Sequence, residues 1–171
     1  MSLSTSNENK LNLIRDVWEV SEEASTRTYF WAGIVKDIYN GTFESEHRDI
    51  DGFTVDLLNK KESLSQLYER RGYKTKFLEE FHILRIDKNG EHAGFNRIDI
   101  DGEVAMWRHI GPEGTLYFPS IWLSNTPKDF YDTKALISGL GFEYCIKKHL
   151  EILSPDWKGR PKELTQNKRY N

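Results

Sequence analysis

Two dipeptides in the middle of the chain constrain its fold more than any other feature of the sequence. Asn89-Gly90 and Asp101-Gly102 are residue pairs that favour two-residue turns between antiparallel strands. The stretches on either side of these turns predict four successive strands. We expect them at residues 73–78, 81–87, 91–100 and 103–110. The later part of the chain therefore predicts an antiparallel meander.

The first half of the chain predicts helices that alternate with short strands. Apolar residues at helical spacing predict an amphipathic helix over residues 10–22. Further helices are expected from Ile34 to Asn40-Gly41, from Leu57 to Gly72 and over residues 136–153, and short strands over residues 28–31 and 49–55. Together with the meander, this order predicts an α/β (α+β) fold, in which helices flank a mixed sheet.

The length of 171 residues fits one domain with its own hydrophobic core. We expect this domain to span residues 1–171, with residues 1–9 and 163–171 flexible. An aromatic content of 13% is typical of a globular chain rather than a disordered one. The net charge of −3 provides no general attraction to nucleic acid or to an anionic membrane, so neither is an expected partner. A monomer or a homodimer is expected.

The sequence also predicts a cytoplasmic location. Its only cysteine, Cys145, cannot form an internal disulfide, which suits a reducing compartment. Because Cys145 falls within a predicted helix, we expect it in the core rather than as a nucleophile. The polar N-terminal segment lacks the apolar region of a signal peptide, and no apolar stretch is long enough to span a bilayer.

Asp49 and Asp51 are the most informative candidate site residues. Residues two apart on a strand point to the same face, so the two carboxylates are expected side by side. Such a pair suits Mg²⁺, whose remaining ligands are usually waters and substrate phosphates. Gly33, before a short predicted helix, would let the backbone approach a phosphate closely. The alternative is that Asp-Ile-Asp is only a solvated strand end, because this pattern is common.

The segment from Tyr29 to Asp51 resembles the signature of the lincosamide and aminoglycoside nucleotidyltransferases, within the polymerase-beta-like nucleotidyltransferase superfamily. In that family a Gly-Gly-Trp turn is followed by a helix with an Asp, then by a glycine and by Arg-Glu-His-x-Asp-hydrophobic-Asp. The matching positions here are Trp31, Ala32-Gly33-Ile34, Asp37, Gly41 and Ser45-Glu46-His47-Arg48-Asp49-Ile50-Asp51. The spacing is preserved without gaps. Looser similarity extends to Arg71-Gly72-Tyr73, to the Asn89-Gly90 turn and to Arg160-Pro161-Lys162.

This resemblance implies a nucleotidyltransferase-like fold and a function. The protein would transfer a nucleoside monophosphate from a nucleoside triphosphate to a hydroxyl of a small acceptor. Asp49 and Asp51 would be catalytic and would bind Mg²⁺ and the triphosphate. Ala32, Gly33 and Lys162 would bind the nucleotide.

The third carboxylate of the family falls on His92, in His92-Ala93-Gly94. Three interpretations stay open. His92 could act as the catalytic base, because imidazole titrates near neutrality. Glu91 or Asp99 could substitute, although a regular strand would point both away from the face of His92. Alternatively, the site has decayed and the domain binds a nucleotide or a protein without transfer; Ala32, in place of the first glycine, and the bulky Ile34 and Val35 favour this interpretation.

An aromatic-rich region follows the meander. Its members are Trp107, Tyr117, Phe118 and Trp122. Core packing is the simpler interpretation. The alternative is a wall on which an acceptor could stack.

Overall fold

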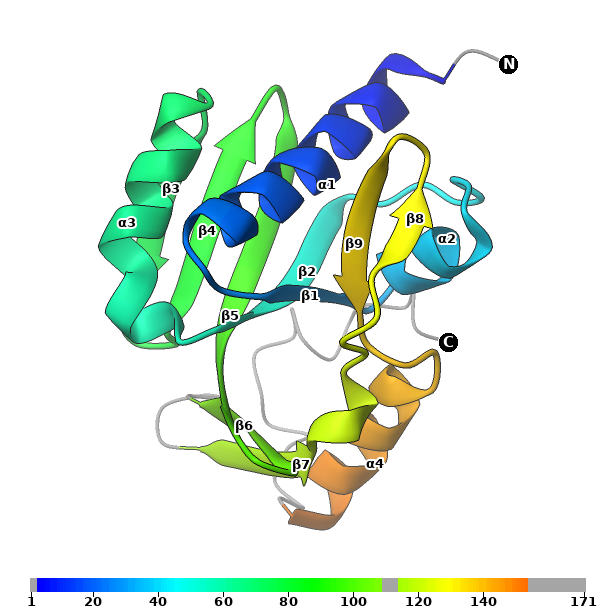
Figure 1. The fold of residues 1–171 in the computed structure, drawn as a ribbon. Helices are drawn as coiled ribbons and strands as arrows, with labels where there is room; N and C mark the ends of the chain where they lie inside the picture. Colours follow the sequence, from blue (N-terminus) through cyan, green and yellow to red (C-terminus); the bar gives the residue numbers. More distant parts are fainter. Residues whose placement is uncertain (1–2, 109–113, 154–171) are drawn as a thin grey trace.

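The structure is a computed structural model that describes residues 3–108 and 114–153. The described residues form a nine-stranded mixed sheet with helices on both faces (Figure 1). The strands are β1 (Thr28–Trp31), β2 (Asp49–Val55), β3 (Lys74–Leu78), β4 (Ile83–Lys88), β5 (Glu91–Asp101), β6 (Val104–Arg108), β7 (Thr115–Pro119), β8 (Lys128–Phe130) and β9 (Thr133–Ile137). The helices are α1 (Thr5–Glu23), α2 (Ile34–Asn40), α3 (Leu57–Arg70) and α4 (Phe142–Leu153), with a 3₁₀ turn at Ser120–Trp122. The expected mixed sheet flanked by helices is confirmed.

The strand order is β3-β4-β5-β2-β1-β9-β8, and β6 and β7 continue the antiparallel meander from β5. The predicted meander is therefore present. Asn89 and Gly90 both adopt positive φ angles, of 54° and 80°, which is the geometry of a type I′ turn. The second turn lies one residue later than expected, because Asp101 pairs with Val104 and only Gly102 has a positive φ, of 56°.

Helix α1 begins earlier than the apolar pattern predicted. Residues 5–9, which were expected to be flexible, belong to the helix. The Ser4 hydroxyl accepts a hydrogen bond from the Asn7 amide at 3.2 Å and so caps the first turn. One turn later, Lys10 forms a 3.0 Å ion pair with Glu91 on β5, and both side chains are buried. These polar contacts anchor a segment that lacks apolar periodicity.

The core has two parts, one on each face of the sheet. Helices α1, α2 and α3 cover the first face with residues such as Ile14, Ile34 and Leu64. Phe142 and Ile146 of α4 pack on the second face, against an aromatic cluster that includes Phe53, Trp107 and Phe118. Figure 1 shows α4 beside β6 and β7, away from the other three helices. The end of the second face near Asp49 carries polar residues instead.

The predicted helix over residues 136–153 is wrong in its first third. Residues up to Ile137 form β9, which pairs in parallel with β1, and α4 begins only at Phe142. Gly139 and Gly141 disfavour a helix between the two, while Leu136 and Ile137 are buried in the sheet. Cys145 is exposed rather than in the core. Within the described residues, no helix is both long enough and apolar enough to cross a membrane.

The pairing of β2 with β5 is the structural centre of the sheet. The two strands are parallel, with seven residue pairs in register from Asp49–His92 to Val55–Ile98. Gly52 lies opposite Phe95, and a Cβ at Gly52 would be only 2.8 Å from the Phe95 ring and 3.1 Å from the Tyr29 carbonyl oxygen. The missing side chain therefore lets the Phe95 ring lie over the β2 backbone.

We expect Gly52→Ala to lower the free energy of unfolding by about 1–3 kcal/mol, because the added methyl group overpacks this contact. Urea unfolding followed by tryptophan fluorescence measures the loss. Gly94→Ala is the matched control on β5, since a Cβ there meets only Ile83 Cγ2 at 3.7 Å. Equal losses in the two variants would contradict this account of Gly52.

Candidate active site

Six residues on three neighbouring strands form one patch of the sheet, which we call the site face. Residues in register on β2, β5 and β4 point to the same side of the sheet. One row across the strands consists of Asp49, His92 and Asp87, and the next consists of Asp51, Gly94 and Arg85. These two rows are the site face.

Burial along the strands confirms that Asp49 and Asp51 share a face. Ile50, between them, is buried against the α1–α3 side, together with its neighbours Ala93 and Ile86. Asp49, His92 and Arg85 are exposed, and Asp51 is half-buried. The two carboxylates and the imidazole therefore lie on the side of the sheet opposite the three N-terminal helices.

His92 is the only one of the three proposed third-position residues on the site face. Glu91 points to the other side, where it pairs with Lys10. Asp99 pairs with Arg97 at 2.8 Å and with Arg108 at 3.0 Å. Both orientations agree with strand alternation. His92 itself contacts Asp87, its direct neighbour on β4, through its Nδ1 atom.

The turn between β1 and α2 contains Ala32, at the position where the family signature has its first glycine. Ala32 adopts a φ of 67°, a left-handed conformation that is strained for a residue with a Cβ. Its side chain is buried, whereas Gly33, at the N-cap of α2, is exposed. A Cβ at Gly33 would lie 3.3 Å from His47 Nδ1. Gly33 therefore lets the His47 ring lie close to the turn and keeps its own backbone accessible.

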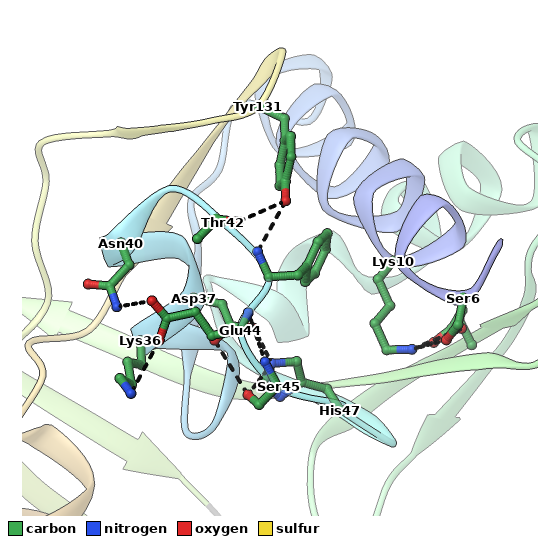
Figure 2. Close-up of polar contacts among 12 residues, drawn as sticks. Ser6, Lys10, Lys36, Asp37, Asn40, Thr42, Glu44, Ser45, His47 and Tyr131 are labelled. Carbon is green, nitrogen blue, oxygen red and sulfur yellow. Dashed lines mark hydrogen bonds and ion pairs between the residues drawn. The ribbon is translucent and has the colours of Figure 1, made fainter. Parts of the chain in front are cut away.

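A buried polar contact connects α2 with the segment before β2 (Figure 2). Asp37 is fully buried, and its Oδ2 atom lies 2.8 Å from His47 Nε2. The same oxygen accepts hydrogen bonds from the backbone amides of Glu44, at 3.1 Å, and Ser45, at 3.4 Å. Asp37 thus holds the loop that leads into Asp49 in one conformation. The same contact holds His47 at this loop.

Figure 2 shows a second contact that orders the same loop. The Tyr131 hydroxyl, from the turn between β8 and β9, accepts a hydrogen bond from the Phe43 amide at 3.1 Å and lies 3.2 Å from Thr42 Oγ1. The Phe43 and Tyr131 rings stack with their centroids 5.6 Å apart. The loop that leads into β2 is therefore held by two contacts, one with Asp37 and one with Tyr131.

An aromatic cluster borders the site face. Trp31 lies opposite Asp51 across the β1–β2 pair, and its ring stacks on Phe53 at a centroid distance of 5.2 Å. Trp107 packs edge-on against both rings. Trp107 and Phe118 are buried, as core packing predicts, and Trp122 is partly buried against the same cluster. Tyr117 is exposed.

The residues of the site face fit a magnesium ion whose remaining ligands come from substrate and water. Two carboxylates on one accessible side of a strand are the donor type that Mg²⁺ prefers. Among the described residues, no three His, Cys, Asp or Glu side chains are grouped closely enough to hold a metal. Asp49 and Asp51 would therefore hold the ion as a pair, with phosphate oxygens completing its coordination.

The residues around the site include some that the sequence predicted and some that it did not. Among the predicted ones, Lys162 lies outside the described residues. Asp87 and Arg85 were not predicted from the sequence, although the Asn89-Gly90 turn fixes their pairing with β5 by simple counting. The contact between Asp37 and His47, which are ten residues apart, was not predicted either, because no local pattern reveals it.

Comparison with solved structures identifies the fold. The structure of the lincosamide antibiotic adenylyltransferase LnuA with bound lincomycin matches with a TM-score of 0.62 and 18% identity, over 81% of this chain and 84% of that one. ANT(2″)-Ia in complex with adenylyl-2″-tobramycin matches with a TM-score of 0.61 and 14% identity, over 94% and 86% of the two chains. The solution structure of the antibiotic-resistance factor ANT(2″)-Ia gives 0.60 and 12%, over 96% and 99%.

No protein-family model matches the chain, and no curated protein sequence matches it. At identities of 12–18%, the structural likeness shows the fold alone. The chain has a nucleotidyltransferase-like fold, which confirms the fold class expected from the segment between Tyr29 and Asp51.

We expect Ala32→Gly to raise the free energy of unfolding by up to about 1 kcal/mol, because glycine relieves the left-handed strain. Chemical unfolding of the purified variant measures the gain. Ala24→Gly is the control, since Ala24 has an ordinary φ of −80° and glycine there should only destabilise. A loss of stability in both variants would contradict strain at Ala32.

We expect Asp37→Asn to lower the free energy of unfolding by about 2–4 kcal/mol, because the amide no longer offers a charged acceptor to His47 and the loop amides. Hydrogen exchange at the Glu44 and Ser45 amides should accelerate in parallel. Asp129→Asn, at an exposed position of β8, is the control. If Asp37→Asn behaved like this control, the contact would not be what holds the loop.

Proposed function

We propose that this chain is a Mg²⁺-dependent nucleotidyltransferase, which transfers a nucleoside monophosphate from a nucleoside triphosphate to a hydroxyl of a small acceptor. The observation that carries this proposal is the placement of Asp49 and Asp51 on one accessible side of β2, within a nucleotidyltransferase-like fold. A solvated strand end would explain why Asp49 is exposed and Asp51 half-buried. It would not explain why a buried network built on Asp37 orders the segment that leads into them.

Asp49 and Asp51 would hold the metal ion, which when bound neutralises phosphate charge and favours attack at phosphorus. The two carboxylates repel each other in the absence of a cation, and an ion between them would remove that repulsion. Asp51 is paired on both sides, with Trp31 of β1 and Gly94 of β5, and Asp49 pairs with His92 of β5. These pairings hold the backbone of β2, so the two carboxylates would need little rearrangement to bind.

Gly33 would contact the triphosphate through its exposed backbone, and its neighbour Ala32 would shape that turn. Because Ala32 is buried, its contribution would be to the backbone conformation rather than a direct contact. Lys162 is proposed from the family resemblance alone, as a cation for a phosphate group.

His92 would act as the general base. The acceptor hydroxyl oxygen would attack the α-phosphorus, the bond from that phosphorus to the bridging oxygen of the leaving pyrophosphate would break, and the hydroxyl proton would pass to His92. The position of His92 beside Asp49, in register on the neighbouring strand, supports this role. Glu91 and Asp99 are less suited because both point away from the site face.

The acceptor is proposed only as a hydroxyl-bearing small molecule. The solved structures with this fold include one with lincomycin and one with adenylyl-2″-tobramycin, and their acceptors are of this general kind. We place the activity in the cytoplasm, where nucleoside triphosphates are available and the exposed Cys145 stays reduced.

A second candidate function is a module that binds a nucleotide or a protein without transferring a nucleotide. The absence of a three-residue metal group among residues 3–108 and 114–153 favours this alternative. The two functions differ in chemistry rather than in fold. Nucleotide binding without any transfer, under conditions in which Asp49 and Asp51 are intact, would select the binding module.

We expect Asp51→Asn to weaken Mg²⁺-dependent binding of the preferred nucleoside triphosphate at least tenfold, because it removes one of two metal-holding carboxylates. Calorimetric titration of the four nucleoside triphosphates, with and without Mg²⁺, measures this effect. Asp101→Asn is the matched control, because Asp101 is an exposed residue at the far end of β5. Circular dichroism verifies that both variants are folded.

Two results of this titration would contradict the proposal. Undiminished binding to Asp51→Asn would mean that the nucleotide site lies elsewhere. Failure of the wild-type protein to bind any triphosphate with Mg²⁺ would mean that the domain has lost nucleotide binding altogether.

A further inference from the structure

The third position of the site face is occupied by a pair of side chains rather than by one. The hairpin at Asn89-Gly90 places Asp87 of β4 directly opposite His92 of β5, and His92 lies in register with Asp49 of β2. The three residues therefore form one row across three neighbouring strands. An Asp87 carboxylate oxygen contacts the Nδ1 atom of His92.

This contact determines where the neutral imidazole carries its proton. An ionised carboxylate can only accept a hydrogen bond, so Nδ1 must be the donor. The Nε2 atom is then unprotonated and keeps its lone pair, which is the form required of a base. A histidine without such a partner exchanges between both tautomers.

The charged groups around His92 favour the same arrangement. Asp87 lies on one side of it and Asp49 on the other, both in register. The neighbouring Glu91 points to the opposite face, where Lys10 neutralises it. Lys88 donates its hydrogen bond to the Arg71 carbonyl oxygen and so is also directed elsewhere. Of these groups, Asp87 is the one whose carboxylate contacts a nitrogen of the ring.

The pair has little value as a structural contact. The side chains of His92 and Asp87 are 57% and 43% exposed. Ion pairs that are open to solvent typically contribute only about 0–1 kcal/mol to stability. Removal of Asp87 should leave the fold intact, and its effect on His92 can therefore be measured in a folded protein.

We propose that Asp87 is a positioning residue, which holds His92 in the Nδ1–H tautomer and leaves Nε2 as the proton acceptor on the site face. The His92–Asp87 pair then does the work of the single third carboxylate expected at this place. The catalytic role of the pair rests on the proposed nucleotidyl transfer. The tautomer of His92 depends only on its contact with Asp87 and does not rest on that proposal.

Nitrogen-15 NMR of the imidazole groups tests the inference directly. The experiment uses the whole 171-residue chain at a pH of about 8.5, about two units above the ordinary pKa of a free imidazole, and His92→Gln assigns the His92 signals. In the wild-type protein we expect an unprotonated Nε2 and a protonated Nδ1. In Asp87→Ala the two signals should move toward the averaged positions of an unrestrained histidine.

Two further variants sharpen the comparison. Asp87→Glu should restore the wild-type tautomer at least in part, because it returns a carboxylate to β4. Asp129→Ala, on β8, should change nothing at His92. The inference is overturned if wild-type His92 is mainly the Nε2–H form, or if Asp87→Ala leaves its signals unchanged.

Titration of the same samples with ATP and Mg²⁺ separates this inference from the proposed function. A wild-type protein with the Nδ1–H tautomer that fails to bind the nucleotide would uphold the role of Asp87 and reject the transferase. A protein that binds Mg²⁺ and ATP, but whose His92 tautomer does not depend on Asp87, would reject the positioning role alone.

Discussion

The parallel pairing of β2 with β5 is the constraint on which the rest of the structure depends. It brings Asp49 beside His92, which is more than forty residues later in the chain. It also places Ile50 and Ala93 together on the opposite face, in the core under the N-terminal helices. The register is set where the Phe95 ring lies over Gly52, because a shift by one residue would place a side chain in that space and reverse every residue on the strand. The site face is a consequence of this pairing rather than an independent feature.

The segment before β2 shows how the fold supports that pairing from outside the sheet. Asp37 has no exposed surface, and it accepts hydrogen bonds from the loop that returns from α2. The same turn keeps Ala32 at a φ of 67°, a conformation that glycine would adopt more easily. A strained turn and a buried contact of a carboxylate therefore lie next to Asp49, which is exposed, and Asp51, which is half-buried. Such a concentration of costly features beside an accessible patch is typical of functional sites.

The sequence predicted what depends on local chemistry. The Asn89-Gly90 turn, the alternation that puts Asp49 and Asp51 on one side, and the helices with clear apolar spacing were all accessible to it. What it missed depends on distant partners. Residues 133–137 form a strand because β1 is there to pair with them, and the start of α1 is held by a contact with Glu91 on β5. Asp87 is an intermediate case, since counting across the hairpin would have placed it beside His92.

The charges of the site face bear on whether the site has decayed. Carboxylates that lie side by side repel each other unless a cation or a proton donor lies between them. The site face carries three carboxylates, Asp49, Asp51 and Asp87, in two rows across its strands. Asp87 lies one strand beyond the position expected for a third carboxylate, and His92 lies between it and Asp49. An imidazole at that position can accept a proton without adding a negative charge where a triphosphate would bind. On this ground we propose His92, rather than a third carboxylate, as the base.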